Sequence, residues 1–272
     1  MNLRGVIMSL LLIAATAHAA DDPLTFVLIQ PGSPGSSEEA APLMARWAGY
    51  LSAHLPGRPR VNGLYVNSLE QAKSVVQSKN KPHFAIVTLP YYLEQRGRHD
   101  LQPQLISRPG GKSDDRYRLL VATASPVANW RALKGDVAGT LCYNADAVAR
   151  LMFRQPSFAA LPFRCQPTDR LLRSARQVVR GELSGVLVTD EQFTSLMALP
   201  EGKQLRLLHA SELLPPPLVV TFGQPDAALH GVIQALLGMK DDPTATELLT
   251  ELRTDGFGPL DLAGLTLLQN RP

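Results

Sequence analysis

The fold is decided by residues 24–54, which read LTFVLIQPGSPGSSEEAAPLMARWAGYLSAH. The apolar run Leu24–Ile29 is short and rich in β-branched and aromatic residues, which is typical of a buried strand. A loop of Pro, Gly and Ser follows. A helix is expected from Ser36-Ser37, because a hydroxyl caps the first turn and Glu38-Glu39 favours its positive end. Apolar residues then recur at helical spacing as far as His54, so the stretch predicts a strand, a loop and a helix.

The same cycle repeats after this stretch. Residues 60–66 are predicted to form a strand, residues 68–77 a helix, and Phe84–Val87 a second buried strand. Pro90 follows in the first turn of a short helix, where its missing backbone N–H costs nothing. Strands that alternate with helices in this way are typical of parallel βαβ units with helices on both faces of a sheet.

A second α/β block is expected from Trp130 onward. Residues 101–107 and 117–124 are predicted to be strands that lead out of the first block, and residues 205–208 and 218–222 strands that return to it. The other expected elements are the strands 137–143 and 186–188 and the helices 145–154, 169–181, 191–199, 226–239 and 243–255. The chain of 272 residues is long enough for two lobes of about 100 residues or more each.

The N-terminus has the features of an export signal. Arg4 provides a positive charge, residues 5–15 form an apolar run, and Ala17-His18-Ala19 matches the small-x-small pattern of a cleavage site. The alternative, a membrane anchor, would need about 20 apolar residues. We therefore predict a signal peptide over residues 1–19 and a periplasmic protein.

Composition and charge exclude several classes of function. Hydrophobic residues make up 45% of the chain and charged residues 19%, as in a packed globular protein. The formal charge of +3 is too small to indicate a nucleic-acid partner or a membrane surface. We expect a monomer that binds no nucleic acid.

Cys142 and Cys165 are the only cysteines of the chain. In an oxidising periplasm such a pair usually forms a disulfide, which would stabilise the fold by about 3 kcal/mol if it were unstrained. The alternative, a metal or redox pair, lacks CxxC spacing and a neighbouring histidine. We predict a structural disulfide.

A resemblance to a known family becomes visible in the second half of the chain. Residues 205–220, LRLLHASELLPPPLVV, resemble the return segment of substrate-binding proteins of the phosphate/phosphite/phosphonate ABC-transporter family. In that family a hydrophobic strand leads to a serine, a proline-rich step and another strand. Similar segments are found at LPYY (89–92), ASPV (124–127), WRALKG (130–135), LLGMKDDP (236–243) and GFGPLD (256–261).

The resemblance implies a two-lobed α/β fold of the type II periplasmic-binding-protein kind. Each lobe would contain a mostly parallel sheet flanked by helices, and two crossover connections would form a hinge. Lobe one would hold residues 20–123 and 205–272, and lobe two residues 126–204. The implied function is capture of a small ligand, with an anion as the first candidate, between the lobes for an ABC transporter.

One segment departs from the family pattern. Phosphonate binders of the family carry a Ser/Thr-rich turn at the start of the first helix of lobe two, whereas residues 142–147 read CYNADA here. Asp146 would repel a phosphoryl group in a low-dielectric site, which argues against phosphonate specificity. An alternative function follows, namely a periplasmic sensory or accessory protein that partners a membrane histidine kinase or another signalling protein.

The candidate ligand contacts lie in loops that follow strands, where open α/β folds bind their ligands. They are Gln30, Ser33, Thr88, Tyr91, Tyr92, Ser125, Tyr143, Asn144, Thr189 and Asp190. Gln30 and Ser33 are equally compatible with an ordinary turn, and Asn144 and Asp190 with helix caps. Of the adjacent Tyr91 and Tyr92, one is expected to face the core.

Catalytic motifs are missing from the sequence. It contains no G-x-S-x-G elbow, no H-E-x-x-H and no closely spaced set of His, Cys and Asp. We therefore expect a binding protein that is not an enzyme and that carries no cofactor and no metal.

Overall fold

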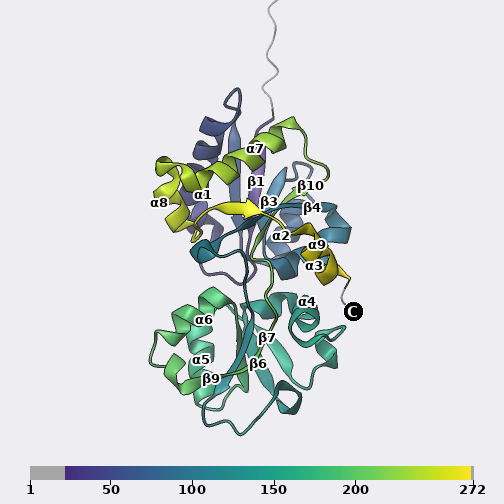
Figure 1. Ribbon diagram of the computed structural model, residues 1–272, viewed down its shortest axis with the longest axis vertical. Coiled ribbons are helices and arrows are strands. Elements are labelled where there is room, and N and C mark those ends of the chain that lie inside the picture. Colours follow the sequence, from purple (N-terminus) through teal and green to yellow (C-terminus); the bar gives the residue numbers. More distant parts are fainter. Residues whose placement is uncertain (1–21, 271–272) are drawn as a thin grey trace, which may run out of the picture.

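The computed structural model describes residues 22–270, which form two lobes stacked along the long axis of the molecule (Figure 1). Each lobe is built around one sheet with helices packed against it. The predicted signal peptide, residues 1–19, lies outside the described residues. In the described part of the chain, no helix combines the length and apolar character that a membrane span requires.

Lobe one contains a six-stranded mixed sheet. Its strands, in spatial order, are β11 (Phe257–Pro259), β4 (Leu101–Ser107), β10 (Leu218–Phe222), β3 (Phe84–Val87), β1 (Leu24–Ile29) and β2 (Val61–Val66). β2 and β3 are both parallel to β1, as the βα alternation predicts. β10 runs antiparallel between β3 and β4, because the chain re-enters lobe one from the opposite direction.

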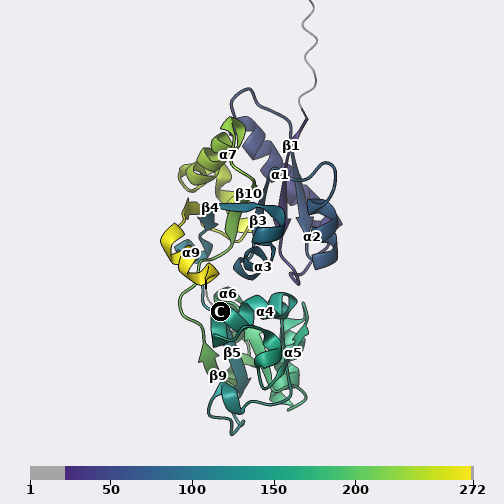
Figure 2. The same ribbon diagram turned by 90° about the vertical axis from the view of Figure 1, so that its right-hand side faces the viewer.

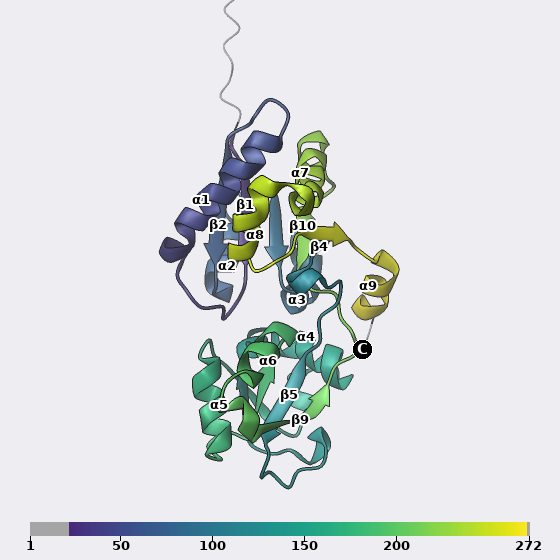
Figure 3. The same ribbon diagram turned by 60° about the vertical axis from the view of Figure 1, so that its left-hand side comes forward.

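Helix α1 (Ser37–His54) forms as the opening stretch of sequence predicts. The Ser36 hydroxyl accepts a hydrogen bond from Glu39 N at 3.1 Å, and the Glu39 carboxylate accepts one from Ser36 N at 2.7 Å. On the inner face of α1, the buried Trp47 meets the ring of Phe26 edge-on, with 4.9 Å between the ring centres. These contacts fix α1 over the sheet (Figure 3).

The remaining helices of lobe one lie on both faces of its sheet. They are α2 (Leu69–Val76), α3 (Leu89–His99), α7 (Ala227–Gly238), α8 (Thr246–Glu251) and α9 (Leu262–Gln269). Ser68 caps α2 through Gln71 N, and Asp226 caps α7 through Leu229 N. α9 and β11 have no counterpart among the predicted elements. Most of the others begin and end within a few residues of the expected positions.

Lobe two contains a five-stranded mixed sheet. Its strands, in spatial order, are β7 (Arg164–Pro167), β6 (Asp136–Gly139), β8 (Gly185–Val188), β5 (Arg118–Ala122) and β9 (Leu205–Ala210). Its helices are α4 (Ala145–Val148), which continues as a π-type turn over Ala149–Phe153, α5 (Leu171–Val179) and α6 (Asp190–Met197). β6 is parallel to β7 and β8, whereas β5 is antiparallel to β8 and β9. Both sheets are therefore mixed, but in each of them most strands run in the same direction, which agrees with the expectation of mostly parallel sheets.

The lobe boundaries differ from the predicted ones, which gave residues 20–123 and 205–272 to lobe one. β5 pairs with β8 on one side and with β9 on the other, so β5 and β9 belong to lobe two. The fully buried Leu120 of β5 packs in the apolar cluster of lobe two, beside Val186. The sequence of a strand does not reveal which sheet it joins, and this assignment depends on pairing with residues far along the chain.

Two crossovers connect the lobes and lie side by side. They are residues 108–117 and 211–217, and a backbone bridge joins them between Asp115 and Leu214. The first crossover begins with a turn at Pro109–Gly111, directly after β4. Figure 2 shows the connecting segments along one side of the molecule.

The predicted strand 137–143 is also shorter than expected. β6 ends at Gly139, and Thr140–Asn144 forms a 3₁₀ turn that leads into α4. A side chain at Gly139 would collide with the backbone carbonyl of Leu187 in β8. The close approach of the two strands therefore requires glycine here, and the chain turns directly after it.

Candidate functional site

The two lobes meet through loops that follow their strands, as open α/β folds predict. Lobe one contributes the loop 30–36 after β1 and the first turns of α3 after β3. Lobe two contributes the turn Thr140–Asn144 and the starts of α4 and α6, with α3 directly opposite α4 (Figure 3). One continuous cluster of buried apolar side chains extends from lobe one into lobe two. We call these loops and helix starts the interlobe face.

Gly32 and Tyr143 form the first contact across the interlobe face. Gly32 has a φ of 77°, in the left-handed region that favours glycine. A Cβ at this position would overlap the aromatic ring of Tyr143 and lie close to Thr140. The ring of lobe two therefore packs directly against the backbone of lobe one.

Glu94 forms the second contact and is the one charged group of α3 with hydrogen bonds into lobe two in the described structure. Its Oε2 accepts a hydrogen bond from the Asn144 side chain (Nδ2) at 2.7 Å, and its Oε1 accepts one from Ala147 N at 3.2 Å. Asn144 is 4% exposed and makes no capping bond to its own helix. A carboxylate from lobe one thus satisfies a side-chain donor and a backbone donor of lobe two.

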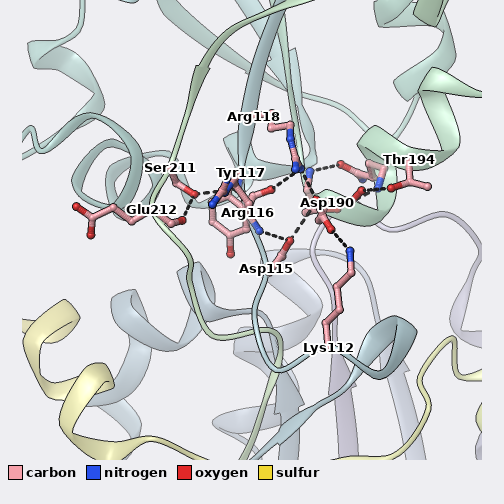
Figure 4. A network of polar contacts seen from close by, with 11 residues as sticks. Lys112, Asp115, Arg116, Tyr117, Arg118, Asp190, Thr194, Ser211 and Glu212 are labelled. Atoms are coloured by element: carbon pink, nitrogen blue, oxygen red, sulfur yellow. Dashed lines mark hydrogen bonds and ion pairs between the residues drawn. The ribbon is translucent and has the colours of Figure 1, made fainter.

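Asp190, at the start of α6, is held by two cations (Figure 4). Its carboxylate accepts a hydrogen bond from Lys112 Nζ at 2.8 Å and pairs with Arg118 Nη1 at 2.5 Å. Burial raises the pKa of Asp190, but the bonds from Lys112 and Arg118 outweigh it and hold that pKa below its usual range. The negative charge of Asp190 is therefore balanced by Lys112 and Arg118 of the protein itself.

Asp115 connects this ion pair to the crossovers (Figure 4). Its Oδ1 accepts hydrogen bonds from Arg116 N at 2.7 Å and from Asp190 N at 3.0 Å. Burial raises the pKa of Asp115, and these two backbone bonds oppose the rise. Next to it, Tyr117 N donates to Ser211 Oγ of the second crossover at 3.0 Å. Both crossovers are thereby tied to each other and to α6.

A disulfide holds the turn that carries Tyr143 and Asn144. Cys142 in the turn is bonded to Cys165 in β7, with a Cα–Cα distance of 5.5 Å, as predicted. The disulfide joins two elements of the same lobe. It therefore fixes the interlobe face of lobe two without restricting movement between the lobes.

The family of the chain follows from comparison with known proteins. The model of the family described as "ABC transporter, phosphonate, periplasmic substrate-binding protein" matches residues 33–265. The chain belongs to this family. It is a family of binding proteins rather than enzymes, which confirms the recognition and the functional class expected from the sequence. No curated protein sequence matches the chain.

Solved structures support the same fold. A Xanthomonas citri protein, solved with chloride ion and with ATP, is 19% identical with a TM-score of 0.68, covering 90% of this chain and 96% of that one. The binding protein component of an ABC phosphonate transporter from Pseudomonas aeruginosa is 14% identical (TM-score 0.62; 92% and 87% covered). PhnD1 from Prochlorococcus marinus, in complex with methylphosphonate, is 8% identical (TM-score 0.63; 91% and 97% covered). These similarities confirm the two-lobed binding-protein fold.

In this phosphonate-family protein, most of the predicted contact residues lie on or near the interlobe face. Tyr143 and Asn144 face lobe one directly, as described above. Thr189 caps α6 by accepting a hydrogen bond from Gln192 N at 3.3 Å, so its hydroxyl is engaged within lobe two. In the loop after β1, Ser33 N donates to the Gln30 carbonyl at 3.0 Å, which is the turn geometry offered as their alternative role.

The predicted tyrosines after Thr88 are more deeply buried than expected. Thr88 caps α3 by accepting a bond from Tyr91 N at 3.4 Å. Tyr91 and Tyr92 are both buried, whereas only one of them was expected to face the core. The Tyr92 hydroxyl accepts a hydrogen bond from Gln269 of α9 at 2.9 Å. Burial raises the pKa of Tyr91 to about 12.

Ser125 lies far from the interlobe face, which corrects its prediction as a ligand contact. β5 is antiparallel to β8, and Arg118 pairs with Val188 at the end of β8 that leads to the interlobe face. The chain therefore runs away from lobe one along β5, and Ser125 follows at the distal end of lobe two. There it lines a cavity of about 500 Å³ together with Leu133 and Ser184. A second cavity, of about 330 Å³, lies between α1, β2 and α2 in lobe one.

Four residues of this region were not predicted from the sequence: Glu94, Gly32, Lys112 and Arg118. Gly32 lies in the predicted loop and is the only one of the four with a usable signal, because Pro31-Gly32 is typical of a turn. The other three are charged residues in a helix, a loop and a strand, and only the folded structure gives them partners. Among residues 22–270, no group of three or more His, Cys, Asp or Glu side chains could hold a metal ion.

Proposed function

We propose that this protein captures a small oxyanion of the phosphonate type between its two lobes and delivers it to an ABC permease. The observation that carries the proposal is the pair of donors at Asn144 Nδ2 and Ala147 N, which bind a carboxylate in this structure. Two convergent N–H donors suit an oxygen anion, whether carboxylate or phosphonate. The family and the methylphosphonate complex of PhnD1 support the same ligand class.

Asp146 does not oppose this proposal in the way the sequence suggests. Its carboxylate accepts a hydrogen bond from Phe158 N at 2.8 Å, in the loop that follows the π-type turn. This bond directs part of its negative charge toward a backbone N–H of lobe two and away from Asn144. The repulsion expected for a phosphoryl group is reduced accordingly.

Movement about the crossovers would open the interlobe face for the ligand. The first crossover is tied to lobe two through Asp115 and Asp190, and to lobe one through the hydrogen bond from Gly111 N to Asp255. We propose that bending occurs between these two attachments. Lys112 of the first crossover contributes to the network through its ammonium group. The lobes would then close again on the ligand as rigid units.

The ligand is tested by calorimetry on the mature protein, residues 20–272, with methylphosphonate, inorganic phosphate, sulfate and acetate. At least one of these anions is expected to bind, and Asn144→Ala to weaken that binding, because it removes one hydrogen bond to a charged group. Asn80→Ala, an exposed change elsewhere in lobe one, is the matched control and should bind as the wild type does. The proposal fails if none of the four anions binds to the wild type.

We propose further that residues 1–19 direct export to the periplasm, that the protein acts as a monomer and that its partner is a permease. The family supports the permease, and the apolar run with its cleavage motif supports export. A membrane sensor is the alternative partner. The observation that favours it is the contact of Glu94 with Asn144 and Ala147, which gives the two lobes a defined arrangement for a partner to recognise. Neighbouring genes for a permease and an ATPase would support transport, and a histidine kinase gene would support sensing.

A further inference from the structure

Glu94 holds the position that the proposed ligand would need. It lies on α3 of lobe one and is partly exposed, while both donors that it meets belong to lobe two. Each carboxylate oxygen accepts one of the two bonds, so the side chain is engaged in the bidentate manner of a bound acid. An oxyanion that enters between the lobes must compete with it for the same two N–H groups.

The surroundings of Asn144 make this contact a condition of closure. Asn144 is 4% exposed, and its side-chain amide is bonded to Glu94 rather than to its own helix. A buried amide without an acceptor is strongly disfavoured. The lobes can therefore close in this arrangement only if an acceptor is present, and Glu94 supplies one without any ligand.

The contact between Gly32 and Tyr143 limits the ways in which the two lobes can pack against each other. Tyr143 precedes Asn144 in the sequence, and its ring packs against the backbone of Gly32 in the loop after β1. This contact holds the turn that carries Asn144 against lobe one, beside Glu94. Glu191 and Arg253 add an exposed ion pair across the lobes at 3.3 Å. Neither of these contacts supplies an acceptor to Asn144 or Ala147. That role belongs to Glu94.

We infer that Glu94 is an internal competitor that closes the lobes in the absence of ligand and sets the affinity for oxyanions. A ligand must displace it, so the apparent affinity is reduced by the fraction of molecules in which the donors are already occupied. Only the ligand-binding part of this inference rests on the proposed function. Closure of the ligand-free protein is a separate consequence.

The ligand-free consequence is tested on the mature protein by small-angle X-ray scattering and by hydrogen exchange. Glu94→Ala is expected to increase the radius of gyration and to speed exchange of the Ala147 amide by about tenfold, because that amide loses its acceptor. Glu94→Gln keeps the shape of the side chain and one acceptor, and should give a smaller change in the same direction. Glu70→Ala, an exposed change on α2, is the matched control. Unchanged size and unchanged Ala147 exchange in both Glu94 variants overturn the inference.

The ligand-binding consequence is tested by calorimetry with methylphosphonate. Glu94→Ala is expected to bind it about tenfold more tightly than the wild type, and Glu70→Ala to bind it equally well. Weaker binding by Glu94→Ala would mean that Glu94 holds the ligand, and would overturn the role of competitor. If methylphosphonate and the other anions bind to none of the proteins while Glu94→Ala opens the lobes, the proposed ligand class fails and the closure by Glu94 stands.

Discussion

At the scale of the residue, Gly32 determines how closely the lobes approach each other. Its left-handed backbone and missing side chain leave room for the ring of Tyr143. The candidate site is thus shaped by the absence of a side chain as much as by donors and acceptors.

Gly32→Ala is expected to separate the lobes. The new Cβ would overlap the Tyr143 ring, and such overpacking destabilises the folded protein by about 1–3 kcal/mol. The radius of gyration from X-ray scattering should increase and anion affinity should fall. Gly57→Ala is the matched control, because Gly57 has a φ of 70° and no neighbouring atom that a Cβ would meet. It should lower the melting temperature through backbone strain alone. Equal radii for Gly32→Ala and the wild type would contradict the expectation.

Tyr91 gives the stability of the protein a dependence on alkaline pH. Burial raises its pKa to about 12, whereas an unfolded tyrosine titrates near 10. The unfolded chain therefore loses its proton first, and stability that is complete below pH 10 falls as the pH rises toward 12.

Tyr91→Phe should remove this part of the alkaline loss. The difference in the free energy of unfolding between variant and wild type should grow by about 1 kcal/mol from pH 8 to pH 11 in favour of the variant. Urea denaturation at both pH values measures it, and the comparison at pH 8 isolates the effect of the lost hydroxyl. Parallel behaviour of the two proteins across this range would exclude Tyr91 as a cause.

At the scale of the element, the turn Thr140–Asn144 depends on the disulfide. The turn contains Cys142 between β6 and α4, and carries Tyr143 and Asn144 toward lobe one. The sequence predicted the disulfide from compartment and cysteine count, but expected a strand in place of the turn. That error arose because apolar residues continue to Leu141, whereas the chain leaves the sheet after Gly139 and forms a 3₁₀ turn.

The double change Cys142→Ala, Cys165→Ala should lower both stability and affinity. The disulfide closes a loop with a sequence separation of 23, and its loss is expected to cost about 3 kcal/mol. Anion affinity should also fall, because the turn holding Asn144 becomes less ordered. Thermal unfolding and calorimetry measure the two effects. A reducing agent should reproduce them in the wild type and leave the double variant unaffected, and a wild type that is insensitive to reduction would contradict this role.

At the scale of the whole molecule, the sequence predicted the alternation of elements, the two lobes and the two crossovers. Local signals were sufficient for the alternation of elements, since caps such as Ser36 and buried runs such as Leu24–Ile29 act over a few residues. The two lobes with their crossovers were implied by the resemblance to the family. The sheet to which β5 and β9 belong depends on long-range pairing, and the error at Ser125 follows directly from it. Glu94 could not be found in advance, because its partners are decided only when the lobes meet.

The position of β10 has a consequence for the order in which the lobes can be completed. Every strand of lobe two lies within residues 118–210, so that lobe needs no sequence from outside this range to pair its strands. In lobe one, β10 (Leu218–Phe222) lies between β3 and β4 and is needed to join them into one sheet. During synthesis from the N-terminus, the first lobe to begin is therefore the last to have a continuous sheet.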